Sequence, residues 1–249
     1  MKALPLIAAS VAGLFLVSCD EVTVVTYEYE SDSNGTTETD GSPAEKRAQG
    51  DRDPIPAVTP PGSQMDPSSN VYIILDGSGS MQGNPILEAK RAVTSFVEGA
   101  PEDLNIGLFC FDYRNMKGTE LVALGKGEEQ RQALKQAISR VSAGGRTPLG
   151  NAIMHGTDAL IERFQMQLRY GDIRLIVVTD GAATDDQVFD QSIRHARKHH
   201  VPIYTIGFHM RSSHPLRQHS ESYLTASDER ELLKAMEETL AELDDDAEL

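Results

Sequence analysis

Apolar runs and amphipathic runs alternate along the chain from Val71 onward. VYIIL at 71–75, LNIGLFCF at 104–111, RLIVVTD at 174–180 and VPIYTIGF at 201–208 are nearly continuous apolar runs, as expected of strands covered on both faces. TELVAL at 119–124 follows the second run, so the two are predicted to form a hairpin through 112–118. Apolar positions recur at helical spacing in 85–97, 127–141, 149–168, 185–199 and 228–243. This order predicts an α/β fold, a doubly wound and mainly parallel sheet flanked by helices.

The first residues have the pattern of an export signal. Lys2 supplies a positive charge, an apolar stretch runs from Ala3 to Val17, and a small residue and a cysteine follow. The stretch is shorter than the roughly 20 apolar residues that a membrane-spanning helix needs. We therefore predict a signal peptide over 1–18.

Leu16-Val17-Ser18-Cys19 resembles the lipobox of bacterial lipoproteins. The resemblance implies cleavage before Cys19, lipidation of this cysteine and attachment of the mature chain to a membrane of the bacterial cell envelope. Asp20 resembles the signal that retains enterobacterial lipoproteins at the inner membrane, which implies its periplasmic face if the organism follows that rule. The alternative is a secretory signal with an incidental cysteine.

Residues 19–69 differ in composition from the rest of the chain. They are rich in Ser, Thr, Gly, Pro and acid, and the stretch from Asp20 to Asn70 has 11 acidic and 3 basic residues. Such a segment buries too little apolar surface to fold alone, so we predict a disordered tether, with a reach of about 40 Å. The alternating EVTVVTYEYE at 21–30 stays unassigned. The last residues, 244–249, are predicted to form an acidic tail.

Composition limits the partners and the redox chemistry. The 249 residues are 39% hydrophobic and have a net charge of −15, which fits one folded domain and disfavours nucleic acid or an anionic lipid surface as the main partner. The chain has 2 cysteines. If Cys19 holds lipid, Cys110 has no intramolecular disulfide partner, and its place in an apolar strand predicts a buried, inert thiol.

Two predicted strands end in the same dipeptide, Asp76-Gly77 and Asp180-Gly181. Ligands of open α/β sheets bind outside the carboxyl ends of the strands, so both carboxylates are expected at the functional edge. After Asp76, Ser78 and Ser80 alternate with glycines, and SAGGRTPLG at 142–150 adds the hydroxyl of Thr147. Carboxylates and hydroxyls together favour Mg²⁺, with Mn²⁺ and Ca²⁺ as alternatives, whereas zinc favours His or Cys.

These residues resemble the metal-ion-dependent adhesion site of von Willebrand factor type A domains. The resemblance covers about residues 70–243 and rests on Asp76-x-Ser78-x-Ser80, Thr147 and Asp180. It implies that Ser78, Ser80 and Thr147 contact a divalent cation, that Asp76 and Asp180 act mostly through water, and that one coordination position accepts an Asp or Glu carboxylate of a partner protein. It implies a binding protein, not an enzyme.

One segment departs from the family pattern. HMRSSHPLRQHSESYLTA at 209–226 has no room for the helix that the family usually places there. We expect a short edge strand to survive at Ser222–Thr225.

Several alternatives stay open. A metal-dependent hydrolase or phosphatase would use the same carboxylates, with Arg146 as the nearby basic residue. A metal-free scaffolding domain would keep the motif without the ion. A subunit beside an ATP-driven motor is disfavoured by export. His195 and His199 share a helical face, but no carboxylate or cysteine follows at matching spacing, so a solvated face is preferred to a second metal site.

Overall fold

The computed structural model describes residues 62–115, 117–210 and 214–245, and in this part of the chain the strands form one sheet. The sheet has six strands in the order β3-β2-β1-β4-β5-β6. Their bounds are Asn70–Asp76 (β1), Asn105–Phe111 (β2), Thr119–Gly125 (β3), Ile173–Thr179 (β4), Ile203–Phe208 (β5) and Ser222–Ala226 (β6). All neighbours pair in parallel except β2 and β3, which pair antiparallel as the hairpin prediction requires.

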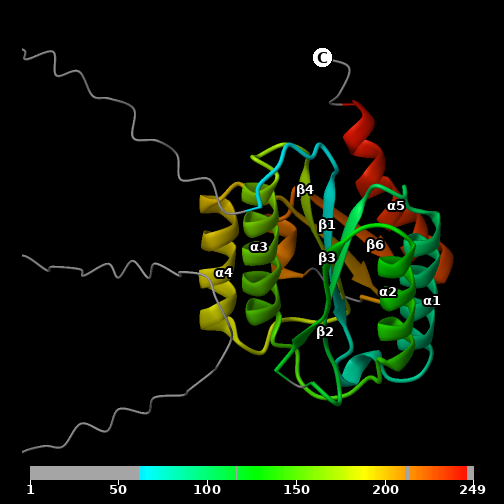
Figure 1. The fold of residues 1–249 in the computed structure, drawn as a ribbon. Coiled ribbons are helices and arrows are strands. Elements are labelled where there is room, and N and C mark those ends of the chain that lie inside the picture. The colour runs from blue at the N-terminus through cyan, green and yellow to red at the C-terminus, as the bar shows by residue number, and fades with distance from the viewer. Residues whose placement is uncertain (1–61, 116, 211–213, 246–249) are drawn as a thin grey trace, which may run out of the picture. The chain divides into compact units, whose positions relative to one another are not determined.

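Helices cover both faces of the sheet. They are α1 (Asn84–Gly99), α2 (Glu128–Arg140), α3 (Leu149–Met166), α4 (Asp186–Lys198) and α5 (Glu229–Asp245), with short 3₁₀ turns η1 (Gly79–Met81) and η2 (Pro215–Gln218). Figure 1 shows α3 and α4 on one side of the sheet and α1, α2 and α5 on the other. The doubly wound fold predicted from the sequence is confirmed.

Strand β1 shows why the chain folds this way. Val71, Ile73 and Leu75 pack in the core under α1, α2 and α5, whereas Tyr72 and Ile74 pack in the core under α3 and α4. Successive side chains of a strand point to opposite faces, so a strand buried on both faces must be apolar throughout. Asp76 is the last residue of this central strand and lies at the carboxyl edge of the sheet.

The segment between β5 and β6 is short, as its sequence indicates. Its described residues contain the 3₁₀ turn η2 in place of a longer helix, and residues 211–213 lie outside the described part. The expected edge strand is present as β6, which runs parallel to β5.

Several predictions fall outside the described residues. They concern the signal peptide, Cys19, the tether up to residue 61, and residues 246–249 of the acidic tail. The first two residues of the predicted tail, 244 and 245, belong to α5, which ends at Asp245. No helix among the described residues combines the length and the apolar character needed to cross a membrane.

The residues just before β1 pack against the amino-terminal edge of the sheet, opposite the edge that contains Asp76. The N–H of Gln64 donates to the carbonyl of Met166 at 3.0 Å, at the end of α3. The N–H of Asn105 donates to the carbonyl of Ser69 at 2.9 Å, where β2 begins. These contacts lie on the amino-terminal side of the predicted domain boundary at residue 70.

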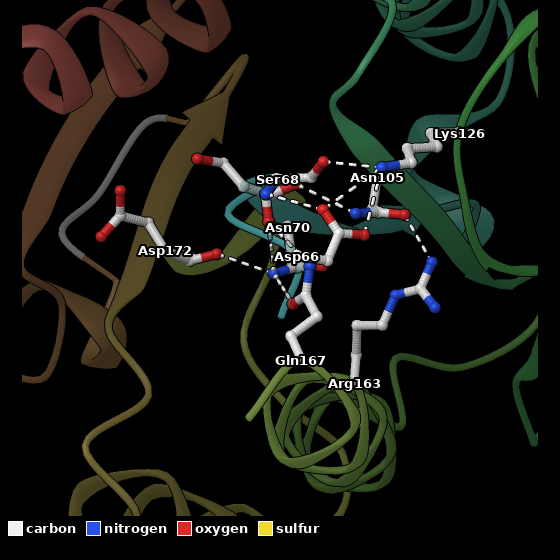
Figure 2. Close-up of polar contacts among 9 residues, drawn as sticks. Asp66, Ser68, Asn70, Asn105, Lys126, Arg163, Gln167 and Asp172 are labelled. Atoms are coloured by element: carbon white, nitrogen blue, oxygen red, sulfur yellow. Dashed lines mark hydrogen bonds and ion pairs between the residues drawn. The ribbon is translucent and has the colours of Figure 1, made fainter. Parts of the chain in front are cut away.

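Side chains complete this attachment, which we call the basal latch and define as Asp66, Ser68, Asn70, Lys126 and Gln167. Figure 2 shows them gathered at the base of the sheet. The ammonium group of Lys126 donates to the Ser68 hydroxyl at 2.7 Å and lies 3.1 Å from the Asp66 carboxylate. The buried Asn70 amide donates to the Gln167 side chain at 2.7 Å. The latch joins the incoming chain to the end of α3 and to the residue after β3.

Candidate metal centre

Three loops meet at the carboxyl edge of the sheet. The loop after β1 contains Gly77 and Gly79, and it is joined to the loop between α2 and α3 by two backbone hydrogen bonds. The N–H of Gly79 donates to the carbonyl of Gly145 at 3.2 Å, and the N–H of Gly144 donates to the carbonyl of Gly77 at 2.8 Å. A side chain at Gly77 would lie 2.9 Å from the Phe111 carbonyl oxygen, and Gly145 has φ +90°, so both positions require glycine.

The third loop follows β4 and presents Asp180. The Ser80 hydroxyl donates to the Asp180 carboxylate at 2.7 Å, and it lies 3.1 Å from the Ser78 hydroxyl. Adjacent oxygens around an octahedral Mg²⁺ at 2.0–2.1 Å are about 3 Å apart, so the spacing of these oxygens fits such an ion. The structure thus brings together residues that are about 100 positions apart in the sequence.

Asp76 is fully buried at the end of β1. Its carboxylate accepts hydrogen bonds from the N–H of Ser78 at 2.8 Å and from the hydroxyl of Thr179 at 2.7 Å. Burial raises the pKa of Asp76 to about 6, in spite of these hydrogen bonds, which lower it. The ionised form of this buried carboxylate is therefore unfavourable in free energy unless a positive charge lies near it.

Asp180 is in a similar position. Burial is the main cause that raises the pKa of Asp180 above its ordinary value of 3.8. In the described part of the chain, no lysine or arginine forms a salt bridge with Asp76 or Asp180. His209 is the basic side chain that acts on Asp180 electrostatically. Two carboxylates without a Lys or Arg salt bridge in the described part of the chain, beside hydroxyl oxygens, are a donor set that fits a hard divalent cation.

Thr147 lies in the loop between α2 and α3, which the loops after β1 and after β4 both contact. It is buried, and its carbonyl accepts from the N–H of Thr184 in the loop after β4 at 2.8 Å. The Asp185 carboxylate of that loop accepts from the N–H groups of Gly150 and Asn151, both at 3.0 Å, and so caps the start of α3. The five predicted residues therefore lie on adjoining loops of one edge. Their role as metal ligands stays a prediction.

Three residues that support the candidate site were not predicted from the sequence. Thr179 and Asp185 hold Asp76 and the Thr147 loop, as described above. The third is His214, whose Nε2 donates to the carbonyl of Gly181 at 2.7 Å while Nδ1 accepts from the N–H of Leu216 at 3.0 Å. Because Nδ1 accepts a hydrogen bond, this arrangement requires the neutral ring, and burial lowers the pKa of His214 in the same sense. The ring thereby fixes the residue next to Asp180. Only Thr179 had a sequence signal, because it precedes Asp180.

His195 of α4 has a partner that the sequence did not reveal. Nε2 of His195 lies 2.7 Å from the carboxylate of Asp158 on α3, and the rings of His195 and His199 are 4.7 Å apart. Even so, no group of three His, Cys, Asp or Glu side chains among the described residues is arranged to hold a metal ion. Cys110 is buried as predicted, and burial raises the pKa of its thiol.

The sheet order, the helices on both faces and the hydroxyl and carboxylate groups define an α/β domain with a cluster of oxygen donors at its carboxyl edge. The family model for the von Willebrand factor type A domain matches residues 70–242, and the chain belongs to this family.

Individual relatives are distant. The inter-alpha-trypsin inhibitor heavy chain H1 of Mesocricetus auratus is 27% identical over 157 residues, which are 59% of this chain and 17% of that protein. The pilus adhesin SpaC of Lactobacillus rhamnosus GG superposes with a TM-score of 0.59 at 15% identity, covering 72% of this chain and 30% of SpaC. The manganese-loaded TRAP protein of Plasmodium vivax has a TM-score of 0.51 at 18% identity, covering 70% and 73%. These structural likenesses show the fold.

Proposed function

We propose that this chain is a membrane-anchored lipoprotein whose von Willebrand factor type A domain binds a partner protein in a cation-dependent manner. The observation that carries the proposal is the cluster at the carboxyl edge, where Ser78, Ser80 and Asp180 lie within hydrogen-bond distance of one another. The buried Asp76 carboxylate lies behind them. Domains of this family commonly mediate protein–protein interaction or adhesion, and one structural relative is described as manganese-loaded.

Ser78, Ser80 and Thr147 would contact the cation, with Asp76 and Asp180 supplying charge around it. Mg²⁺ is our first choice, and Mn²⁺ or Ca²⁺ fit the same donors. When bound, such a cation offers a coordination position to an outside anion. The hydroxyls are neutral, so they leave the positive charge less compensated than a set of carboxylates would.

The partner that fits this site is a protein that presents an Asp or Glu side chain. The chain has a net charge of −15, so a carboxylate has little attraction to most of its surface. A partner carboxylate should therefore bind at the cation, which makes binding both selective and sensitive to chelators.

Partner capture from membranes in the presence of Mg²⁺, with and without chelator, tests this function. Capture should be lost with chelator and with Asp76→Ala, and weakened by Ser80→Ala or Thr147→Ala. Ser139→Ala, at an exposed serine of α2, is the matched control and should capture normally. Unchanged capture by folded Asp76→Ala protein in chelator would refute the proposal.

The anchor is proposed from the lipobox resemblance at Cys19, on the periplasmic face of the inner membrane. Labelled fatty acid should enter the wild-type protein and should not enter Cys19→Ala. Cys110→Ala is the matched control, because it removes the other cysteine and should leave labelling intact. Labelling that persists in Cys19→Ala would place the lipid elsewhere.

A further inference from the structure

Exposed apolar side chains gather at the amino-terminal edge of the sheet. Met65 is 66% exposed, Leu168 39% and Tyr170 46%, and they are three of the five large apolar residues that are exposed in the described part of the chain. Leu168 and Tyr170 follow α3, and Met65 adjoins the Gln64–Met166 hydrogen bond at the end of the same helix. The three side chains therefore lie on one end of the domain.

The turn after α3 holds its side chains in an unfavourable backbone conformation. Leu168 and Arg169 have φ +55° and +65°, in the left-handed region that glycine normally occupies after a helix. The N–H of Arg169 donates to the carbonyl of Phe164 at 2.8 Å, which closes this helix end. A leucine and an arginine at such positions lower the stability of the folded domain relative to glycine.

Basic residues of α4 lie beside this turn. The stretch RHARKHH at 194–200 contains three Arg or Lys residues and three His residues and no acid, in a chain with a net charge of −15. Arg169, Lys198, His199 and His200 line one cavity of about 200 Å³ between the ends of α3 and α4. We call the set Met65, Leu168, Arg169, Tyr170 and Lys198 the basal patch.

We propose that the basal patch is a membrane-facing surface that binds anionic phospholipid headgroups. Arginine and lysine pair with phosphates, and tyrosine, leucine and methionine fit the boundary between headgroups and acyl chains. Residues 64–70, which precede β1 directly, pack against this same edge through the basal latch and the Gln64–Met166 hydrogen bond. The proposal rests on the membrane attachment proposed above, because the preceding segment contains Cys19.

The acidic balance of the whole chain does not prevent such contact. The Debye length is about 8 Å at physiological ionic strength, so a membrane responds mainly to the charges nearest to it. Asp172 is the acidic side chain in the turn itself, and Asp66 is paired with Lys126. Arg169 and Lys198 therefore leave the basal patch itself basic, whereas the exposed acids Glu102, Asp103 and Glu221 lie beside other strands of the same edge.

Tryptophan fluorescence tests the proposal, because the chain contains no tryptophan. Tyr170→Trp places a single fluorophore in the patch of the full-length chain. Tyr113→Trp is the matched control, since Tyr113 is 69% exposed and follows β2 at the opposite edge. Both proteins are reconstituted with vesicles of phosphatidylcholine and phosphatidylglycerol whose acyl chains contain bromine.

Brominated vesicles should quench the emission of Tyr170→Trp several-fold more than that of Tyr113→Trp. Adding Arg169→Glu and Lys198→Glu should raise the lipid concentration for half-maximal quenching roughly tenfold or more, because each basic residue contributes to binding. Vesicles of phosphatidylcholine alone should quench weakly.

Equal quenching of both fluorophores, or quenching that is insensitive to lipid charge and to the reversals, would overturn the proposal. The Tyr170→Trp emission could also be unaffected by lipid but change when the acidic residues of 20–45 are replaced by Asn and Gln. That result would show that the basal patch binds this segment and not lipid, and would overturn the proposal. The readout needs neither the cation nor the acyl group. Retained quenching of a Tyr170→Trp protein that takes up no labelled fatty acid although Cys19 is intact would refute the anchor alone, and normal partner capture without quenching would refute the surface alone.

Discussion

The carboxyl edge with Asp76, Ser78, Ser80, Thr147 and Asp180 is called the metal edge here, after the cation predicted to bind there. Its side chains are positioned by contacts with their neighbours. The Thr179 hydroxyl and the Ser78 N–H donate hydrogen bonds to the buried Asp76 carboxylate and so stabilise its ionised form. Its oxygens are fixed before any ligand arrives, so little ordering is needed on binding. The same holds for Asp180, whose neighbour Gly181 is held by His214.

Thr179→Val should weaken binding of Mg²⁺ or Mn²⁺ by about tenfold, because a hydrogen bond to a charged group contributes about 1.5–3 kcal/mol. Valine keeps the shape of threonine and removes the donor to Asp76. Titration calorimetry with each metal ion measures the effect. Thr225→Val, at an exposed threonine of β6, is the control and should bind normally. Equal affinities of wild type and Thr179→Val would show that the Thr179 hydroxyl does not support the site.

At the scale of elements, the segment before β1 behaves as part of the domain. Hydrogen bonds from the Ser68 hydroxyl and N–H, followed by Lys126, lower the pKa of Asp66 from 3.8 to about 2. A carboxyl group whose pKa is lower in the folded state adds stability above its unfolded pKa and loses it as the pH falls. The basal latch should therefore weaken between about pH 4 and pH 2.

Asp66→Asn should lower the free energy of unfolding at pH 7, and the difference from wild type should shrink as the pH falls toward 2. The asparagine has no charge to lose, which is why the two proteins converge. Denaturant unfolding at pH 7, 4 and 3 measures it, with Asp186→Asn in the first turn of α4 as a control outside the latch. A difference that stays constant with pH would contradict the role of the Asp66 charge.

In the turn after α3, a substitution is predicted to raise the free energy of unfolding. Leu168→Gly should raise the free energy of unfolding by about 1 kcal/mol, because glycine adopts φ +55° without the steric cost of a Cβ atom. Leu87→Gly, at an exposed leucine inside α1, is the matched control and should be destabilising by about 1 kcal/mol. Destabilisation by Leu168→Gly would mean that the leucine side chain stabilises the folded domain.

At the scale of the whole molecule, the two ends of the sheet have different roles. Strand β1 has seven residues, so the basal latch and the metal edge are separated by roughly 20 Å. The basal latch is at one end, and the candidate cation site is at the other. A domain attached to a membrane through its amino-terminal segment can therefore present the cation site to a partner on its far side.

Binding of a divalent cation should stabilise the folded domain by mass action, by about 2.7 kcal/mol at a concentration of 100 times Kd. Chelator should remove this increment from wild type and should leave Asp76→Ala unchanged. Asp158→Ala, on the helix surface beside His195, should keep the full increment. Thermal unfolding followed by circular dichroism measures all three proteins. An increment that survives in Asp76→Ala would place the stabilising ion elsewhere.

The sequence by itself determined the class of fold, because apolar runs of strand length alternate with helical periodicity and each pattern can bury its apolar side in only one way. It also indicated the residues of the metal edge, since Asp76 and Asp180 each directly follow a buried strand. Tertiary structure alone decided what surrounds them. The contacts of Asp158 with His195, of His214 with Gly181 and of Lys126 with Ser68 join residues 33 or more positions apart. No local pattern encodes such pairs, because they arise only when packing of the sheet and helices brings distant loops together.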